Sequence, residues 1–207
     1  MTSHQGQDDL INWVVKNLQE RSIVSPKRRL VHMKEKPARR PSFYVRAVRL
    51  GHPMIAYRFG NRTFDEGSLR FILMHEEKHI QSPLSWIVPT ALISTDMVFL
   101  VRFLLMAATY DFLVSLGMFL AVWYGSMPLL RHGEVRADLW SARRLRTDFG
   151  IRAPSEVALH ALSWPEVVES RVRKVFRSVT VGPIHPSVAQ RVARIAEEVD
   201  ERPGNPL

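Results

Sequence analysis

Residues 66–79 read Glu-Gly-Ser-Leu-Arg-Phe-Ile-Leu-Met-His-Glu-Glu-Lys-His, and this stretch decides the expected fold. Its apolar residues recur at helical spacing, which predicts an α-helix with one apolar side. Thr63–Glu66 has the form of a capping box and predicts that the helix begins there. His75 and His79 are one helical turn apart, so both imidazoles lie on the same face of this helix.

The pattern His75-Glu76-x-x-His79 is typical of a zinc-binding helix. Two imidazoles on successive turns can bind one ion. Glu76 points to the edge of the same face, where it can take a proton from a water molecule as a general base. The alternative is a charged helix surface with two incidental histidines.

A catalytic zinc ion keeps three protein ligands and leaves one position for water, so another element must supply a third ligand. The best candidate is Glu134, which follows His75 by 59 positions (134 − 75) in Glu134-Val-Arg-Ala-Asp138. Glu134 and Asp138 are also one helical turn apart. One carboxylate can bind the metal while the other accepts a hydrogen bond from a ligand imidazole. Taken alone, the pair could equally be helix-surface charge.

The composition narrows the classes of protein and of site. The chain has 207 residues, no cysteine and a formal net charge of +9. Without cysteine there are no disulfides and no thiolate ligands, so a metal must be held by histidine and carboxylates. A basic balance of this size usually indicates nucleic acid or an anionic membrane surface as a partner. We expect no nucleic-acid partner, because no nucleic-acid-binding pattern is recognisable.

The basic residues flank an apolar stretch, residues 84–130, whose only charged side chains are Asp96, Arg102 and Asp111. Residues 112–130 form a charge-free run of 19, close to the roughly 20 needed to cross a bilayer. We therefore expect a transmembrane helical hairpin, with a buried hairpin in a soluble protein as the alternative. The first residues lack the features of a signal peptide, so both flanks and the active site are expected on the cytosolic side of the cell membrane.

Further elements are expected on both sides of this hairpin. Before it we expect a helix over 8–21, a basic linker over 26–40, and strands over 42–50 and 54–59. The linker reads either as a solvated loop or as a segment attracted to anionic headgroups. After the hairpin, helices are expected over 133–149, 155–162, 163–178 and 187–199.

Taken together, the His75–His79 helix, the apolar hairpin and Glu134-x-x-Ala-Asp138 resemble the HtpX-type membrane endopeptidases, relatives of the type I CAAX prenyl proteases. His185-Pro186-x-x-x-x-Arg191 is similar to the C-terminal motif of that family. The catalytic helix departs from the family by carrying Glu77 and Lys78 where a small or apolar pair is more usual. The roles that the resemblance implies are zinc ligation by His75, His79 and Glu134, general-base catalysis by Glu76, orientation of a ligand histidine by Asp138, and substrate or oxyanion binding near His185 and Arg191.

The expected fold is mainly α, a zincin-like metallopeptidase domain with a small β-sheet edge and an inserted transmembrane hairpin. Residues 41–83 and 131–200 form the two parts of this domain, 84–130 the hairpin, 1–40 an N-terminal helix and linker, and 201–207 a disordered tail. The expected function is membrane-embedded, zinc-dependent endopeptidase activity on a peptide or protein substrate, with one zinc ion per chain. The alternative is a catalytically inactive membrane adaptor or regulator.

Overall fold

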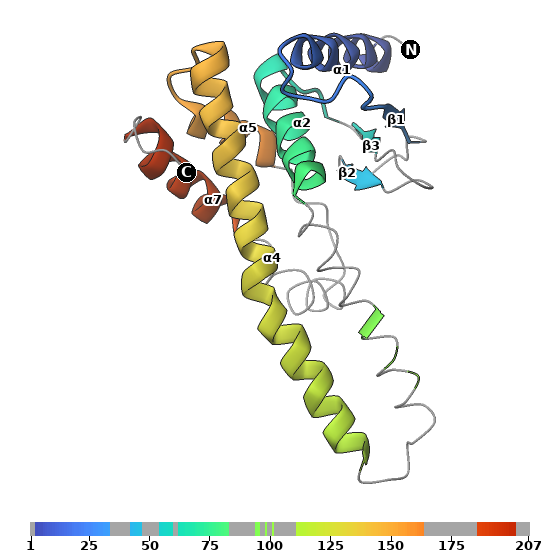
Figure 1. The fold of residues 1–207 in the computed structure, drawn as a ribbon. Coiled ribbons are helices and arrows are strands. Elements are labelled where there is room, and N and C mark those ends of the chain that lie inside the picture. The colour runs from blue at the N-terminus through green and yellow to red at the C-terminus, as the bar shows by residue number, and fades with distance from the viewer. Residues whose placement is uncertain are drawn as a thin grey trace.

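A computed structural model describes residues 3–33, 42–46, 54–59, 62–82, 94–95, 98, 101, 111–163 and 186–201. This part of the chain is mainly helical, with one small sheet (Figure 1). Its elements are α1 (Ser3–Glu20), β1 (Leu30–His32), β2 (Ser42–Arg46), β3 (Met54–Arg58), α2 (Glu66–Gln81), α4 (Asp111–Phe149), α5 (Pro154–Leu162), α7 (Val188–Ile195) and a π-helical turn, η1 (Ala196–Asp200).

The three strands form one mixed sheet in the order β1-β3-β2. The central strand β3 pairs with β1 in parallel and with β2 in antiparallel, so that Ala56 lies between Val31 and Tyr44. The strand expected over 42–50 is confirmed over Ser42–Arg46, and residues 47–50 lie outside the described residues. The strand expected over 54–59 is confirmed over Met54–Arg58. The interpretation of 26–40 as a linker is wrong at Leu30–His32, where the chain is hydrogen-bonded to β3 as a strand.

The predicted helix at the centre of the fold is confirmed as α2, but its cap lies two residues after the expected one. Asp65, not Thr63, is the N-cap, and its Oδ1 accepts a hydrogen bond from the Ser68 amide at 2.7 Å. Asp65 satisfies an amide that the first turn would otherwise leave without a partner.

The hydrophobic core surrounds α2. Leu69 and Leu73 of α2 belong to one buried cluster with Leu18 of α1, Leu145 of α4 and Ala158 of α5. Contacts of α2 with α1, α4, α5 and β2 accordingly cover several sides of the helix. Helix α2, which carries the two histidines, is therefore held in place by packing on several sides.

Helix α4 is continuous over two segments that were expected to be separate, the apolar run 112–130 and the helix over 133–149. The helix expected over 133–149 is its second half, and it ends as expected at Gly150, whose φ of +66° is a left-handed conformation that suits glycine. The first half projects away from the rest of the described structure (Figure 1) and exposes large apolar side chains, including Leu113 and Leu129 at 63% each.

Among the described residues, no helix combines the length and the hydropathy that a membrane crossing requires. Most of residues 84–110, the expected first crossing, lies outside the described residues.

The C-terminal elements follow the expected pattern. Helix α5 confirms the helix expected over 155–162, and α7 with η1 confirms the one expected over 187–199. The helix expected over 163–178 lies, apart from its first residue, outside the described residues, as does the tail after residue 201.

Candidate metal centre

Three side chains with metal-binding atoms meet between α2 and α4. His75 and His79 come from successive turns of α2, and Glu134 comes from the middle of α4. The two Nε2 atoms of the histidines lie 3.0 Å apart. The Glu134 carboxylate lies 3.5 Å from Nε2 of His75 through Oε2 and 3.2 Å from Nε2 of His79 through Oε1.

These separations fit a zinc ion. Zinc binds histidine nitrogen and carboxylate oxygen at about 2.0–2.2 Å with tetrahedral geometry, which places neighbouring ligand atoms about 3.4 Å apart. The three closest separations, 3.0, 3.2 and 3.5 Å, lie near that value, the last two being measured to different oxygens of Glu134. All three side chains are mostly shielded from solvent, and none is a thiolate. The site therefore suits a borderline metal with nitrogen and oxygen ligands.

A second layer of charge lies behind His75. The Asp138 Oδ1 atom is 3.0 Å from Nδ1 of His75, a close ionic contact that is not a well-formed hydrogen bond. Arg191 of α7 donates from Nε and Nη2 to the two oxygens of Asp138, at 2.6 and 2.5 Å. Its Nη2 also lies 4.0 Å from Oε2 of Glu134. Asp138 thus links a histidine that can bind metal to a third helix.

The protonation states follow from these contacts. Burial alone lowers the pKa of His75, but the carboxylates of Asp138 and Glu134 outweigh it and raise the pKa to about 10. Burial alone raises the pKa of Asp138, yet the hydrogen bonds from Arg191 and the charges of Arg191 and His75 hold it below its usual value. Without a metal, His75 is therefore the cation that balances the surrounding carboxylates.

The pKa of Arg191 is also affected by Glu76. Burial lowers the pKa of Arg191, but Asp138, Glu134 and Glu76 together raise it above its usual value. The influence of Glu76 is electrostatic, so its carboxylate lies near enough to Arg191 to affect the pKa of the guanidinium group. Glu76 is half-buried and follows His75 directly on α2.

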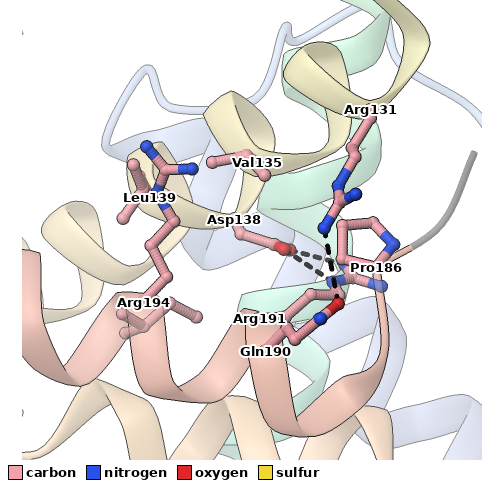
Figure 2. Close-up of a pocket in the computed structure, with 9 residues that line it drawn as sticks. Arg131, Val135, Asp138, Leu139, Pro186, Gln190, Arg191 and Arg194 are labelled. Atoms are coloured by element: carbon pink, nitrogen blue, oxygen red, sulfur yellow. Dashed lines mark hydrogen bonds and ion pairs between the residues drawn. The ribbon is translucent and has the colours of Figure 1, made fainter. Parts of the chain in front are cut away.

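A cavity of about 230 Å³ adjoins this second layer, between α4 and α7 (Figure 2). Asp138 and Arg191 lie at one side of it. Arg131 reaches across to donate a hydrogen bond to Oε1 of Gln190 at 3.4 Å. Val135 and Ile195 contribute apolar lining.

The structure thus brings together His75, His79 and Glu134, and places Asp138 and Arg191 directly behind them. The contact of Arg191 with substrate or oxyanion stays a prediction, and in this structure its side chain is engaged by Asp138. His185, for which a similar role is expected, lies outside the described residues.

Two interactions near this site were not predicted from the sequence. One is the ion pair of Arg191 with Asp138, although both residues belong to the motifs described above. The other is the ion pair of Arg28 with Glu77, a residue of α2 that lies between His75 and His79 in the sequence. The unusual charge at Glu77 was the available signal for the second pair.

No protein-family model, curated protein or solved structure matches this chain.

Proposed function

We propose that this protein is a membrane-embedded, zinc-dependent endopeptidase of the HtpX-like type. The observation that carries the proposal is the meeting of His75, His79 and Glu134 at zinc-ligand separations, backed by Asp138. A solvated helix surface gives no reason for carboxylates from a distant helix to converge on two histidines. Among the described residues, three side chains form this ligand set. Structural zinc sites usually have four protein ligands, whereas a set of three leaves a position for water and favours a catalytic site.

Each side chain then has a definite task. His75, His79 and Glu134 would hold the zinc ion, which supplies an acidified water molecule and polarises the scissile carbonyl group. Glu76 would act as the general base, accepting a proton from a water molecule at this site and passing it to the leaving amine. Asp138 lies against Nδ1 of His75, where it would orient the ring and increase its basicity, and Arg191 in turn holds Asp138 by two hydrogen bonds.

The membrane part of the proposal rests on the apolar sequence of residues 112–130, because no helix among the described residues meets the requirements for a crossing. Residues 112–130 carry no charge and span roughly 28 Å as a helix, close to the roughly 30 Å thickness of a bilayer core. Leu113, Met118 and Leu129 are exposed on more than one face, as in a helix surrounded by lipid or by another protein. Residues 84–130 then form a hairpin that returns Glu134 to the side of the membrane on which α2 lies.

The competing function is a membrane adaptor or regulator that retains this fold without activity. The presence of Glu76 beside the candidate ligands favours the enzyme, because zinc binding alone does not require that carboxylate. Purified protein in detergent should cleave unstructured protein substrates, and Glu76→Gln should retain zinc but lose cleavage. The matched control is Glu156→Gln on the exposed side of α5. A zinc-loaded wild type that cleaves nothing across a broad peptide library supports the adaptor.

A further inference from the structure

A buried carboxylate lies on α2 opposite the candidate metal ligands. Glu77 is 1% exposed and follows Glu76 directly. Since successive residues turn by about 100° around a helix, Glu77 points roughly 160° away from both His75 and His79. The two histidines face α4, while Glu77 faces the N-terminal segment.

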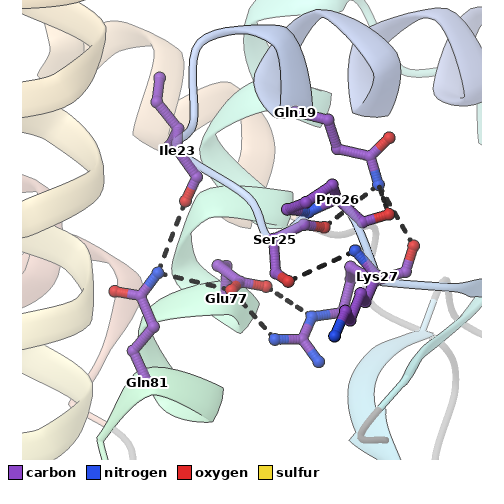
Figure 3. A network of polar contacts seen from close by, with 8 residues as sticks. Gln19, Ile23, Ser25, Pro26, Lys27, Glu77 and Gln81 are labelled. Atoms are coloured by element: carbon purple, nitrogen blue, oxygen red, sulfur yellow. Dashed lines mark hydrogen bonds and ion pairs between the residues drawn. The ribbon is translucent and has the colours of Figure 1, made fainter.

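The partner of Glu77 (labelled in Figure 3) is Arg28, which belongs to the loop between α1 and β1. Arg28 donates from Nε to Oε2 at 2.7 Å and from Nη2 to Oε1 at 3.0 Å, a two-pronged pair. Gln81, one turn further along α2, donates to the same carboxylate at 3.4 Å. The side chain of Arg28 is itself 9% exposed, so both charges are removed from water.

The loop that carries Arg28 is held in place independently. Gln19 of α1 donates from Nε2 to the carbonyl oxygens of Ser25 and Arg28, at 3.2 and 3.3 Å (Figure 3). Beyond the loop, the amide of Ile55 in β3 donates to the carbonyl oxygen of Arg29 at 3.1 Å. Arg28 therefore projects from a fixed backbone rather than from a mobile linker.

A buried ion pair is a costly way to fill a core position, since well-packed apolar residues are often as stable. What the ion pair adds is a defined rotation of α2 about its own axis. Apolar contacts around α2 tolerate a small rotation or slide, but a slip of one residue turns Glu77 by about 100° and breaks both of its bonds to Arg28.

We propose that the Arg28–Glu77 pair is a positioning device that fixes the rotational setting of α2. It thereby aims His75, His79 and Glu76 at the candidate zinc site, and it makes the N-terminal segment part of that site. The inference rests on the proposed zinc-binding function. It explains why this chain carries a charge at a position where the resembling family usually has a small or apolar residue.

The test compares Arg28→Met, Glu77→Leu and the double variant with wild type. Each single variant leaves one buried charge without its partner and should lower the melting temperature by on the order of 10 °C. The double variant has neither charge and should melt within a few degrees of wild type. Its zinc affinity, measured by chelator competition, should nevertheless stay about 10- to 100-fold weaker, as for loss of a group that orients a ligand.

The matched control is Arg29→Met, an identical change one residue away at an exposed side chain, and it should alter neither quantity. If the double variant binds zinc as tightly as wild type, the pair is only structural and the proposal is overturned. Should the single variants fail to fold, the double variant still decides the matter.

Failure of the proposed function can be distinguished from failure of this positioning role. A wild type that binds no zinc refutes the metal site, and hydrogen exchange of the α2 amides then tests whether the Arg28–Glu77 pair positions α2. In zinc-free protein, those amides should exchange at least tenfold faster in the double variant than in wild type. Equal exchange at equal melting temperature would overturn the positioning role.

Discussion

Zinc binding should displace a proton from His75 at a pH where an ordinary histidine carries almost none. The carboxylates of Asp138 and Glu134 raise the pKa of His75 to about 10 in the metal-free protein. Zinc requires the neutral imidazole, so the ion and the proton compete for the same ring. This competition sets the direction of the pH dependence. The apparent zinc affinity must rise with pH until the pH exceeds the pKa of His75 in the metal-free protein.

The size of the effect follows from the same value. At pH 8, a histidine with a pKa of about 10 is about 99% protonated, whereas one at the ordinary value of about 6.5 is about 3% protonated. Binding should therefore release about one proton from His75 at pH 8. Apparent affinity should rise about tenfold per pH unit between pH 7 and 9.

Calorimetry in buffers of different ionisation enthalpy measures the released protons directly. Asp138→Asn should release fewer protons at pH 8, because it removes a carboxylate that holds the proton on His75. Zinc binding with no buffer dependence at pH 8, in wild type and variant alike, would refute the assignment of His75 as a buried ligand between two carboxylates.

The raised pKa also gives the stability of the zinc-free protein a definite pH dependence. Because the folded pKa exceeds the ordinary value of 6.5, the protonated ring stabilises the fold. This contribution is fully present below about pH 6.5 and is lost as the pH rises through about 10. Urea unfolding in the presence of a chelator should show the decline, and Asp138→Asn should reduce it.

Three further predictions follow from the site and its setting. Glu76→Gln should keep full zinc occupancy and lose about 10²- to 10⁴-fold in turnover, and unchanged turnover would remove Glu76 from the chemistry. Asp138→Asn should weaken zinc binding by about 10- to 100-fold, less than His75→Ala does, and an equal loss would make Asp138 a direct ligand. In this cysteine-free chain, a single cysteine at Asp111 should react with an impermeant reagent from outside the cell, while cysteines at Ser3 and Asn205 stay protected. Protection at all three positions would instead favour a hairpin that does not cross the membrane.

The meeting of His75, His79 and Glu134 could be predicted from sequence because most of its geometry is local. His75 and His79 must share a face of any helix that contains both, and so must Glu134 and Asp138. Only the approach of the two helices had to be inferred, from the need of a catalytic zinc ion for a third ligand and from the resemblance. The observed separations are consistent with that approach, while zinc binding itself stays a prediction.

The ion pairs around the cluster could not be predicted in the same way. Arg28 and Glu77 are 49 residues apart, and Asp138 and Arg191 are 53 apart, so no periodicity connects them. Arg28 stands among exposed basic residues, and its burial depends on the β1–β3 pairing, which itself went unpredicted. The Asp65 cap was not predicted because Thr63–Glu66 has the form of a capping box. Only the backbone geometry shows which of Thr63 and Asp65 is the N-cap.

The proposed function depends on His75, His79 and Glu134 together holding a single zinc ion. The most direct test is the zinc content per chain of purified wild type, His79→Ala and Glu134→Ala, with His132→Ala as an exposed neighbouring control. We expect about one zinc per chain in wild type and in the control, and a large loss of zinc in both ligand variants. Full zinc occupancy in His79→Ala and Glu134→Ala, or a wild type that binds no zinc, would contradict the claim.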